Sequence, residues 1–246
     1  MTSEPRTLLH AAPFHTTRWT RVCLAKADSE DGRRALADLC DAYYEPVVAY
    51  LRSVLRDADA GRDLSHAFFA EVLAGGRIHT ADPERGRFRF YLLGAVKHFV
   101  AHGREAGQRL RRGGGVLPLS LDAETFGAPA LEVPDDARLS PEAAFDRQWA
   151  VTVLARAMDV LQAECVAGEK SALFDQLRPS LLGESEYGDQ AAAAAALGLS
   201  AGAMKVAVHR MRHRFRQCVK AEIAGTLKDE AAVEDEMRSL LAALGG

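Results

Sequence analysis

A basic stretch near the C-terminal end of the chain carries the residues best suited to binding an anion. From Ser200 to Lys220, "SAGAMKVAVHRMRHRFRQCVK" contains six Lys or Arg and no carboxylate. Its apolar residues recur every three or four positions, the spacing of one helix face. We predict that this seam enters a protein core while the opposite face meets DNA phosphates and base edges. The seam is Met204, Val208, Met211, Phe215 and Val219, and the opposite face is Lys205, His209, Arg212 and Arg216.

The residues before this stretch predict a helix-turn-helix motif. In "DQAAAAAALGLS" the alanine run 191–196 favours a helix whose small side chains permit close packing. Gly198 can adopt a positive φ, and Ser200 can cap the helix that follows. A short helix, a glycine turn and a basic amphipathic helix are typical of DNA-binding helix-turn-helix units. Alanine-rich helix pairs also occur in plain bundles, which is the alternative interpretation.

A second basic segment lies in the first half of the chain. Residues 85–112 hold eight Lys or Arg and one acid, Glu105, although the whole chain has a net charge of −3. Two separate cationic helices in an otherwise acidic chain indicate two contacts with a polyanion. The alternative is that both segments are solvated helix faces.

Two histidine pairs have the spacing of a helical metal site. His98 with His102 and His209 with His213 are each four residues apart. Neither pair has an obvious carboxylate or cysteine as third ligand, and both lie in cationic segments that repel a metal ion. We therefore expect no metal site.

The composition predicts the cellular compartment of the protein. The cysteines are far apart and form no CxxC pair, so we expect reduced thiols. No apolar run reaches the roughly 20 residues that span a bilayer, and the N-terminus lacks a signal-peptide pattern. These features predict a cytoplasmic protein with no membrane contact. The cysteines are Cys23, Cys40, Cys165 and Cys218.

Helical periodicity dominates the chain and predicts an all-α fold. Between the two basic segments, residues 111–140 contain Gly-Gly-Gly and several prolines, a composition typical of a flexible linker. Helix resumes after Ser140, a suitable N-cap, with Pro141 as the first helical residue. We therefore predict two small helical domains on a tether. The predicted helices in the first half are 18–27, 32–55, 61–74 and 88–108. The predicted boundaries are a tail 1–14, a first domain 15–112, a linker 113–140, a second domain 141–226 and an acidic C-terminal helix 227–246.

The chain resembles a known family along most of its length. "YGDQAAAAAALGLSAGAMKVAVHRMRHRFR" resembles the fourth conserved region of extracytoplasmic-function sigma factors, a group of the bacterial sigma-70 family. "LCDAYYEPVVAYLR", "DADAGRDLSHAFFAEVL" and "RGRFRFYLLGAVKHFVAHGREAGQRLRR" resemble three successive helices of the second conserved region. "DPERGRFR", the "LSLD" after the glycines, "KVAVHRMR" and the acidic C-terminal helix resemble a subgroup associated with Ser/Thr protein kinases.

The resemblance implies a transcription initiation factor without an active site, so we expect no catalytic residue and no cofactor. Such a protein binds core RNA polymerase and carries one DNA-reading surface to the minus-ten element and another to the minus-thirty-five element. A stand-alone helix-turn-helix regulator is the nearest alternative, and an anti-sigma partner is left open. In the cationic helix, Phe90 and Tyr91 can stack on bases or join the core, and Phe99 is expected in the core. The expected DNA contacts are Ser200, Lys205, His209, Arg210, Arg212 and Arg216 in the second domain, and Arg89, Lys97, His98, Arg104 and Arg109 in the first.

The helix that resembles the polymerase-binding element carries less negative charge than the same helix in typical relatives. Arg62 occupies a position that is acidic in typical relatives, and Ala67 replaces a Glu. A phosphate on Ser65 would restore about −1.5 to −2 charge, so we hypothesise that a Ser/Thr kinase activates polymerase binding through Ser65. The alternative is that Ser65 is only a small helix residue. The expected polymerase contacts are Asp57, Asp59, Asp63, His66 and Phe69.

Overall fold

The computed structural model describes residues 18–74, 78–82, 86–113, 139–183, 189–224, 227 and 230–245. Side chains are described throughout these ranges except at 18–21, 104–113, 189, 190 and 230. All regular elements in these ranges are helical, which confirms the all-α prediction. The α-helices are α1 (Arg18–Ala25), α2 (Glu30–Leu55), α3 (Ala58–Leu73), α4 (Phe88–Gly113), α5 (Pro141–Ala167), α6 (Ser171–Leu182), α7 (Asp189–Ala196), α8 (Ala201–Ala224) and α9 (Val233–Gly245), with short 3-10 helices at Ile78–Thr80 and Glu230–Ala232.

Polar side chains fix where the long helices begin. The Ser140 hydroxyl accepts a hydrogen bond from the backbone N–H of Ala143 at 3.1 Å, which confirms the predicted cap of α5. The Asp57 carboxylate accepts from the backbone N–H groups of Asp59 and Ala60 at 3.0 and 3.1 Å. This cap starts α3 at Ala58, earlier than the prediction of residue 61.

Helix α6 was not predicted, because its sequence signal is weak. "SALFDQLRPSLL" has a proline in its interior, which disfavours a helix by itself, although Phe174 and Leu177 are buried. The helix ends at Gly183, whose φ of 79° is favourable only for glycine. Packing of these apolar residues against α5 and α8 stabilises the helix despite Pro179.

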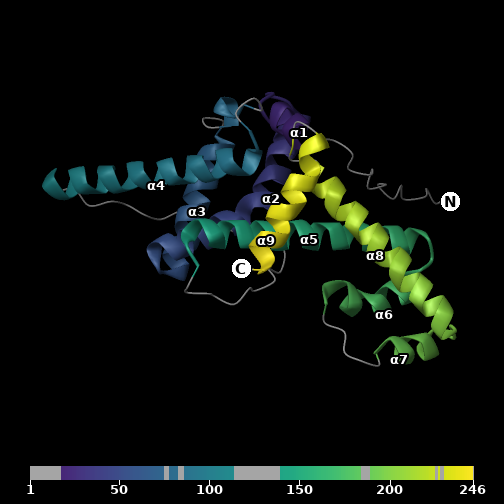
Figure 1. Ribbon diagram of the computed structural model, residues 1–246. Helices are drawn as coiled ribbons and strands as arrows, with labels where there is room; N and C mark the ends of the chain where they lie inside the picture. The colour runs from purple at the N-terminus through teal and green to yellow at the C-terminus, as the bar shows by residue number, and fades with distance from the viewer. Residues whose placement is uncertain are drawn as a thin grey trace, which may run out of the picture.

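The two halves of the chain pack directly on each other. Helix α5 lies along α2, and the buried apolar residues of both halves form one continuous cluster. Figure 1 shows α5 running through the middle of the molecule, with α4 projecting to one side and α8 descending on the other. The predicted arrangement of two tethered domains is therefore not confirmed by the described residues. Most of the predicted linker, and the predicted tail 1–14, lie outside the described residues.

The C-terminal helix α9 lies against α5 and α8 (Figure 1). Its residues Val233, Glu236 and Leu240 are buried and share one face of the helix. The helix thus joins the protein body, and it contributes a buried carboxylate as well as apolar side chains.

Candidate nucleic-acid interface

The turn between α7 and α8 has the geometry that its sequence predicts. Gly198 has a φ of 64°, and the backbone N–H of Leu199 donates to the carbonyl of Ala194 at 2.9 Å. The Ser200 hydroxyl then accepts from the backbone N–H of Ala203 at 3.2 Å. This hydrogen bond confirms Ser200 as the cap of α8. Ala193 and Ala194 are buried where α7 packs on α8, so the small side chains permit the close approach.

The apolar seam of α8 faces the protein body. Met204, Val208, Met211 and Val219 are each at most 7% exposed, as the periodicity predicts. Phe215 is only half-buried, and it packs at the edge of the core. Cys218 and Ile223 are also buried, because they continue the same face beyond the predicted seam, toward α5 and α9.

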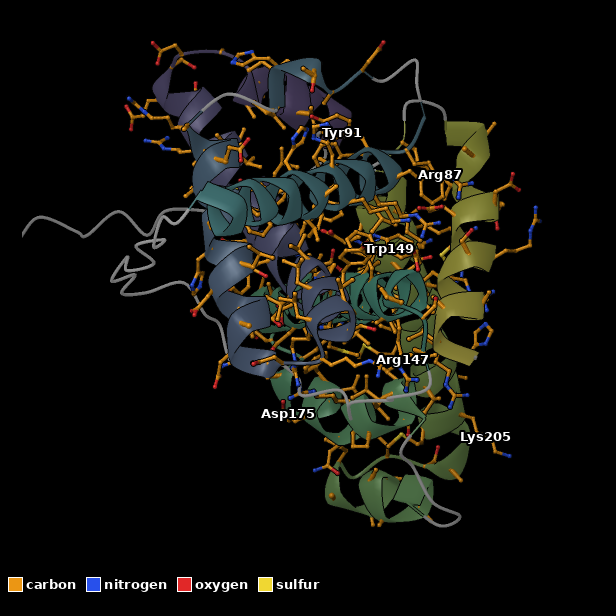
Figure 2. The ribbon with its side chains drawn as sticks, turned by 90° about the vertical axis from the view of Figure 1, so that its left-hand side faces the viewer. Arg87, Tyr91, Arg147, Trp149, Asp175 and Lys205 are labelled. Atoms are coloured by element: carbon orange, nitrogen blue, oxygen red, sulfur yellow. The ribbon has the colours of Figure 1, made fainter. Side chains whose placement is uncertain are left out.

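The predicted DNA face of α8 is directed to solvent. Figure 2 shows the side chain of Lys205 pointing away from the body of the molecule. Arg212 is exposed, but its guanidinium also donates to the carbonyl of Ser180 at 3.2 Å, which ties the end of α6 to α8. The exposed residues of the predicted contact set on this motif are Ser200, Lys205, His209, Arg210, Arg212 and Arg216.

Arg214 lies on the opposite side of α8 and is already paired. Its guanidinium makes a two-pronged contact with the carboxylate of Glu164 on α5, with Nε donating at 2.7 Å. This hydrogen bonding raises the pKa of Arg214. The pair anchors α8 to α5. Arg214 therefore has a structural role, which distinguishes it from the solvent-facing cations of the same helix.

Arg89 was predicted to bind DNA, and in this structure it is buried. The residue is 4% exposed, its Nη1 donates to Asp146 of α5 at 2.6 Å, and its guanidinium lies 4.4 Å from the ring centre of Trp149. Its Nε is 2.8 Å from a carboxylate oxygen of Glu236 on α9, without the alignment of a hydrogen bond. Burial between two carboxylates and an indole removes Arg89 from any DNA in this conformation.

The other predicted cations of α4 differ in their surroundings. Lys97 is exposed and its ammonium lies 2.7 Å from Glu142 of α5, a contact that raises the pKa of Lys97 and lowers that of Glu142. His98 is exposed, and its ring lies against His102 with the Nε2 atoms 2.9 Å apart. Arg104 and Arg109 fall in α4, but their side chains lie outside the described residues.

The aromatic residues of α4 divide between core and surface. Phe99 packs against Phe68 with ring centres 5.5 Å apart, as expected for a core residue. Tyr91 is half-buried and shares a hydrogen bond with Thr80 at 2.9 Å. Phe90 is 51% exposed, and the Arg89 guanidinium lies 4.5 Å from its ring centre. Phe90 is therefore the aromatic of this helix with the most surface free for stacking on a base.

Helix α3 exposes the acidic residues of the predicted polymerase contact. Asp57, Asp59 and Asp63 are exposed, and Asp57 also caps the helix. His66 is half-buried, with its Nε2 2.7 Å from the Tyr44 hydroxyl. Phe69 was predicted as a polymerase contact, but it is 7% exposed and packs against Phe68 and Tyr44. Phe69 is therefore a core residue rather than a contact surface.

Ser65 is buried at the crossing of α3 and α2. It is 0% exposed, and its hydroxyl donates to the Gly61 carbonyl at 2.7 Å. Gly61 itself lies against Arg52, since a Cβ on it would come within 2.9 Å of the Arg52 backbone nitrogen. A kinase cannot reach Ser65 unless α3 separates from α2. The structure thus contradicts the phosphorylation hypothesis for the folded chain and favours the small-residue alternative.

An apolar pocket lies between α2, α3 and α4, and it is lined by residues such as Leu36, Phe68, Phe88 and Leu92. Burial there raises the pKa of the Cys40 thiol to about 12, so it is a poor nucleophile at neutral pH. Within the described part of the chain, no three His, Cys, Asp or Glu side chains are grouped to hold a metal ion. No helix in that part is long and apolar enough to span a bilayer.

Comparison of the chain with protein-family profiles, with curated protein sequences and with solved structures gives no match. The fold and the side-chain geometry define the class of protein. It is an all-α chain in which the short helix α7, a glycine turn and the helix α8 with its exposed cations follow one another.

Proposed function

We propose that this chain is a transcription initiation factor of the extracytoplasmic-function sigma type, which binds core RNA polymerase and directs it to promoter DNA. The observation that carries the proposal is the α7–α8 unit. Its glycine turn, capped helix start and buried seam hold α8 rigidly, while Lys205, His209 and Arg216 remain at the surface. Such an arrangement is suited to entering the major groove of DNA.

The exposed acidic end of α3 supports a polymerase contact. Asp59 and Asp63 lie four residues apart on the helix, so both carboxylates face the same side. An acidic helix face is complementary to a basic surface on a partner, and it steers association between the two. In this proposal α3 binds the polymerase, and α4 and α8 meet different parts of one promoter. A Ser/Thr protein kinase as a partner stays a prediction without an assigned site.

The packing of α5 on α2 implies that the free chain changes shape when it acts. Two DNA surfaces reach separate promoter elements only if the halves move apart. We propose that the closed arrangement is the free state and that the polymerase stabilises an open one. The closed arrangement also favours a second candidate, a stand-alone helix-turn-helix regulator that uses α8 alone.

Binding to core RNA polymerase separates the two candidates. We expect purified chain to co-sediment with purified core polymerase in a one-to-one complex. The matched comparison is a variant with Asp59→Lys and Asp63→Lys, which reverses the acidic face of α3 without touching a buried residue. The sigma proposal is wrong if the wild-type chain stays free of the polymerase at micromolar concentrations while still binding duplex DNA.

A further inference from the structure

A buried ionic cluster joins the start of α4 to α5 and α9. Glu236 of α9 is 0% exposed, and it is in ionic contact with both Arg87 and Arg89. Asp146 of α5 holds the other side of Arg89. Figure 2 shows Arg87 beside α9, with Trp149 beneath the start of α4. The positive charges at this end of α4 are thus covered by carboxylates from two other helices.

Within the described part of the chain, the Arg87 guanidinium makes its polar contacts with α9. Its guanidinium pairs with the Glu236 carboxylate and donates to the Ser239 hydroxyl at 3.4 Å. A guanidinium binds a carboxylate and a phosphate with the same planar, two-pronged geometry. Glu236 therefore occupies the place beside Arg87 that a phosphate oxygen of DNA would need.

The same short helix also reaches the second basic segment. Glu234 of α9 pairs with Lys220 near the end of α8, and this hydrogen bond lowers the pKa of Glu234. One acidic helix thus places carboxylates on cations from both segments that the sequence marks as polyanion contacts. A helix with this charge pattern competes with nucleic acid for both.

The attachment of α9 combines a few apolar side chains with a buried carboxylate. Val233 and Leu240 are buried, and Met237, Ala243 and Leu244 are partly buried against the core. Burial raises the pKa of Glu236, although Arg89 and Arg87 act in the opposite direction. Buried ion pairs add little net stability, because desolvation offsets their attraction. The Trp149 indole N–H also lacks a hydrogen-bond partner among the described residues. A terminal helix held in this way opens at a lower free energy than the whole fold.

We propose that α9 is an autoinhibitory segment that covers Arg87 and Arg89 and competes with DNA phosphates for them, so that the closed chain binds DNA weakly until α9 is released. The inference rests on the proposed function, because it assumes that DNA is the ligand of the basic helices. It further assigns Arg87, which the sequence reasoning did not select, to the DNA-binding surface.

The test measures affinity of the full chain for a fluorescein-labelled mixed-sequence duplex, together with hydrogen exchange of the α9 amides. Glu236→Lys puts a third cation into the buried cluster and releases α9. Asp235→Lys is the matched control, since it makes the same change of charge at an exposed neighbour that pairs within its own helix. Leu240→Ala releases α9 without any change of charge, because it removes a buried side chain of 1% exposure.

We expect both Glu236→Lys and Leu240→Ala to speed hydrogen exchange of the α9 amides. Glu236→Lys is expected to raise DNA affinity about tenfold or more relative to Asp235→Lys, and Leu240→Ala to raise it by the same factor relative to wild type. Faster exchange in α9 with unchanged affinity overturns the autoinhibition and leaves DNA binding by wild type intact. Unchanged exchange in both variants also overturns it. If no chain binds the duplex even with α9 released, the proposed function fails as well.

Discussion

The two sides of α8 differ in a way that the salt dependence of DNA binding can measure. Lys205 is exposed on one flank of the buried seam, whereas Arg214 on the other flank is already paired with Glu164. Lys205→Gln and Arg214→Gln each remove one positive charge from the same helix. Only the first removes a cation that is free to bind phosphate, so the pair of variants separates a contact from a general charge effect.

The magnitude follows from counterion release. A plot of log affinity against log salt concentration falls with a slope of about −0.9 for each phosphate contact on duplex DNA. One contact therefore contributes about eightfold to the affinity at 0.1 M salt relative to about 1 M salt. We therefore expect Lys205→Gln to reduce the slope by about 0.9 and the double variant Lys205→Gln/Arg216→Gln by about 1.8. Arg214→Gln is expected to leave the slope unchanged, since its charge is neutralised by Glu164 in the wild type.

The assay is a fluorescence-anisotropy titration of one duplex at several salt concentrations, with circular dichroism to check that each variant is folded. Equal loss of slope in Lys205→Gln and Arg214→Gln would refute the orientation of α8. So would a Lys205→Gln slope that matches wild type. Either result means that DNA does not lie along the exposed face of this helix.

Three further predictions concern the fold and are checked by urea unfolding or by chemical labelling. Ser65→Glu is expected to lower the free energy of unfolding by about 3 kcal/mol or more, because it buries a charge between α3 and α2. Ser65→Ala is expected to lower it by about 1 kcal/mol. A Ser65→Glu chain as stable as wild type would contradict the burial of this position. Gly198→Ala is expected to lower the free energy of unfolding by about 1 kcal/mol, because Gly198 has a positive φ. Gly202→Ala, in the open first turn of α8, is expected to raise it by about 0.5 kcal/mol. A Gly198→Ala chain more stable than the Gly202→Ala chain would contradict the geometry of the turn at Gly198. At pH 8.5, iodoacetamide is expected to label exposed Cys23 and to spare Cys40, whose raised pKa of about 12 keeps its thiol protonated; rapid labelling of Cys40 would contradict its burial.

Local signals in the sequence account for the parts of the fold that were predicted well. The seam of α8, the Ser200 cap and the turn at Gly198 all depend on residues a few positions apart. The surroundings of Arg89 depend on Glu236, which is 147 residues away in the chain. Composition marks Arg89 as one more cation in a basic helix, and no local pattern reveals the carboxylate that covers it.

The two interpretations of Ser65 depend on different signals in the sequence. The charge deficit of α3 favours a phosphate on Ser65, whereas the residue four positions earlier in the helix is a glycine. Gly61 and Ser65 lie on the same face, and two small residues at this spacing permit a close helix crossing. This signal was present in the sequence and pointed to packing against α2.

The measurement that tests the central claim most directly is initiation of transcription by core RNA polymerase. Core enzyme, the purified chain and a library of genomic fragments are combined, and the 5′ ends of the transcripts are mapped. The account predicts transcripts that start at a defined set of sites, require the chain and are reduced by Lys205→Gln/Arg216→Gln but not by Arg214→Gln. Absence of chain-dependent transcripts at every site, for wild type and for the Glu236→Lys and Leu240→Ala chains alike, would contradict it.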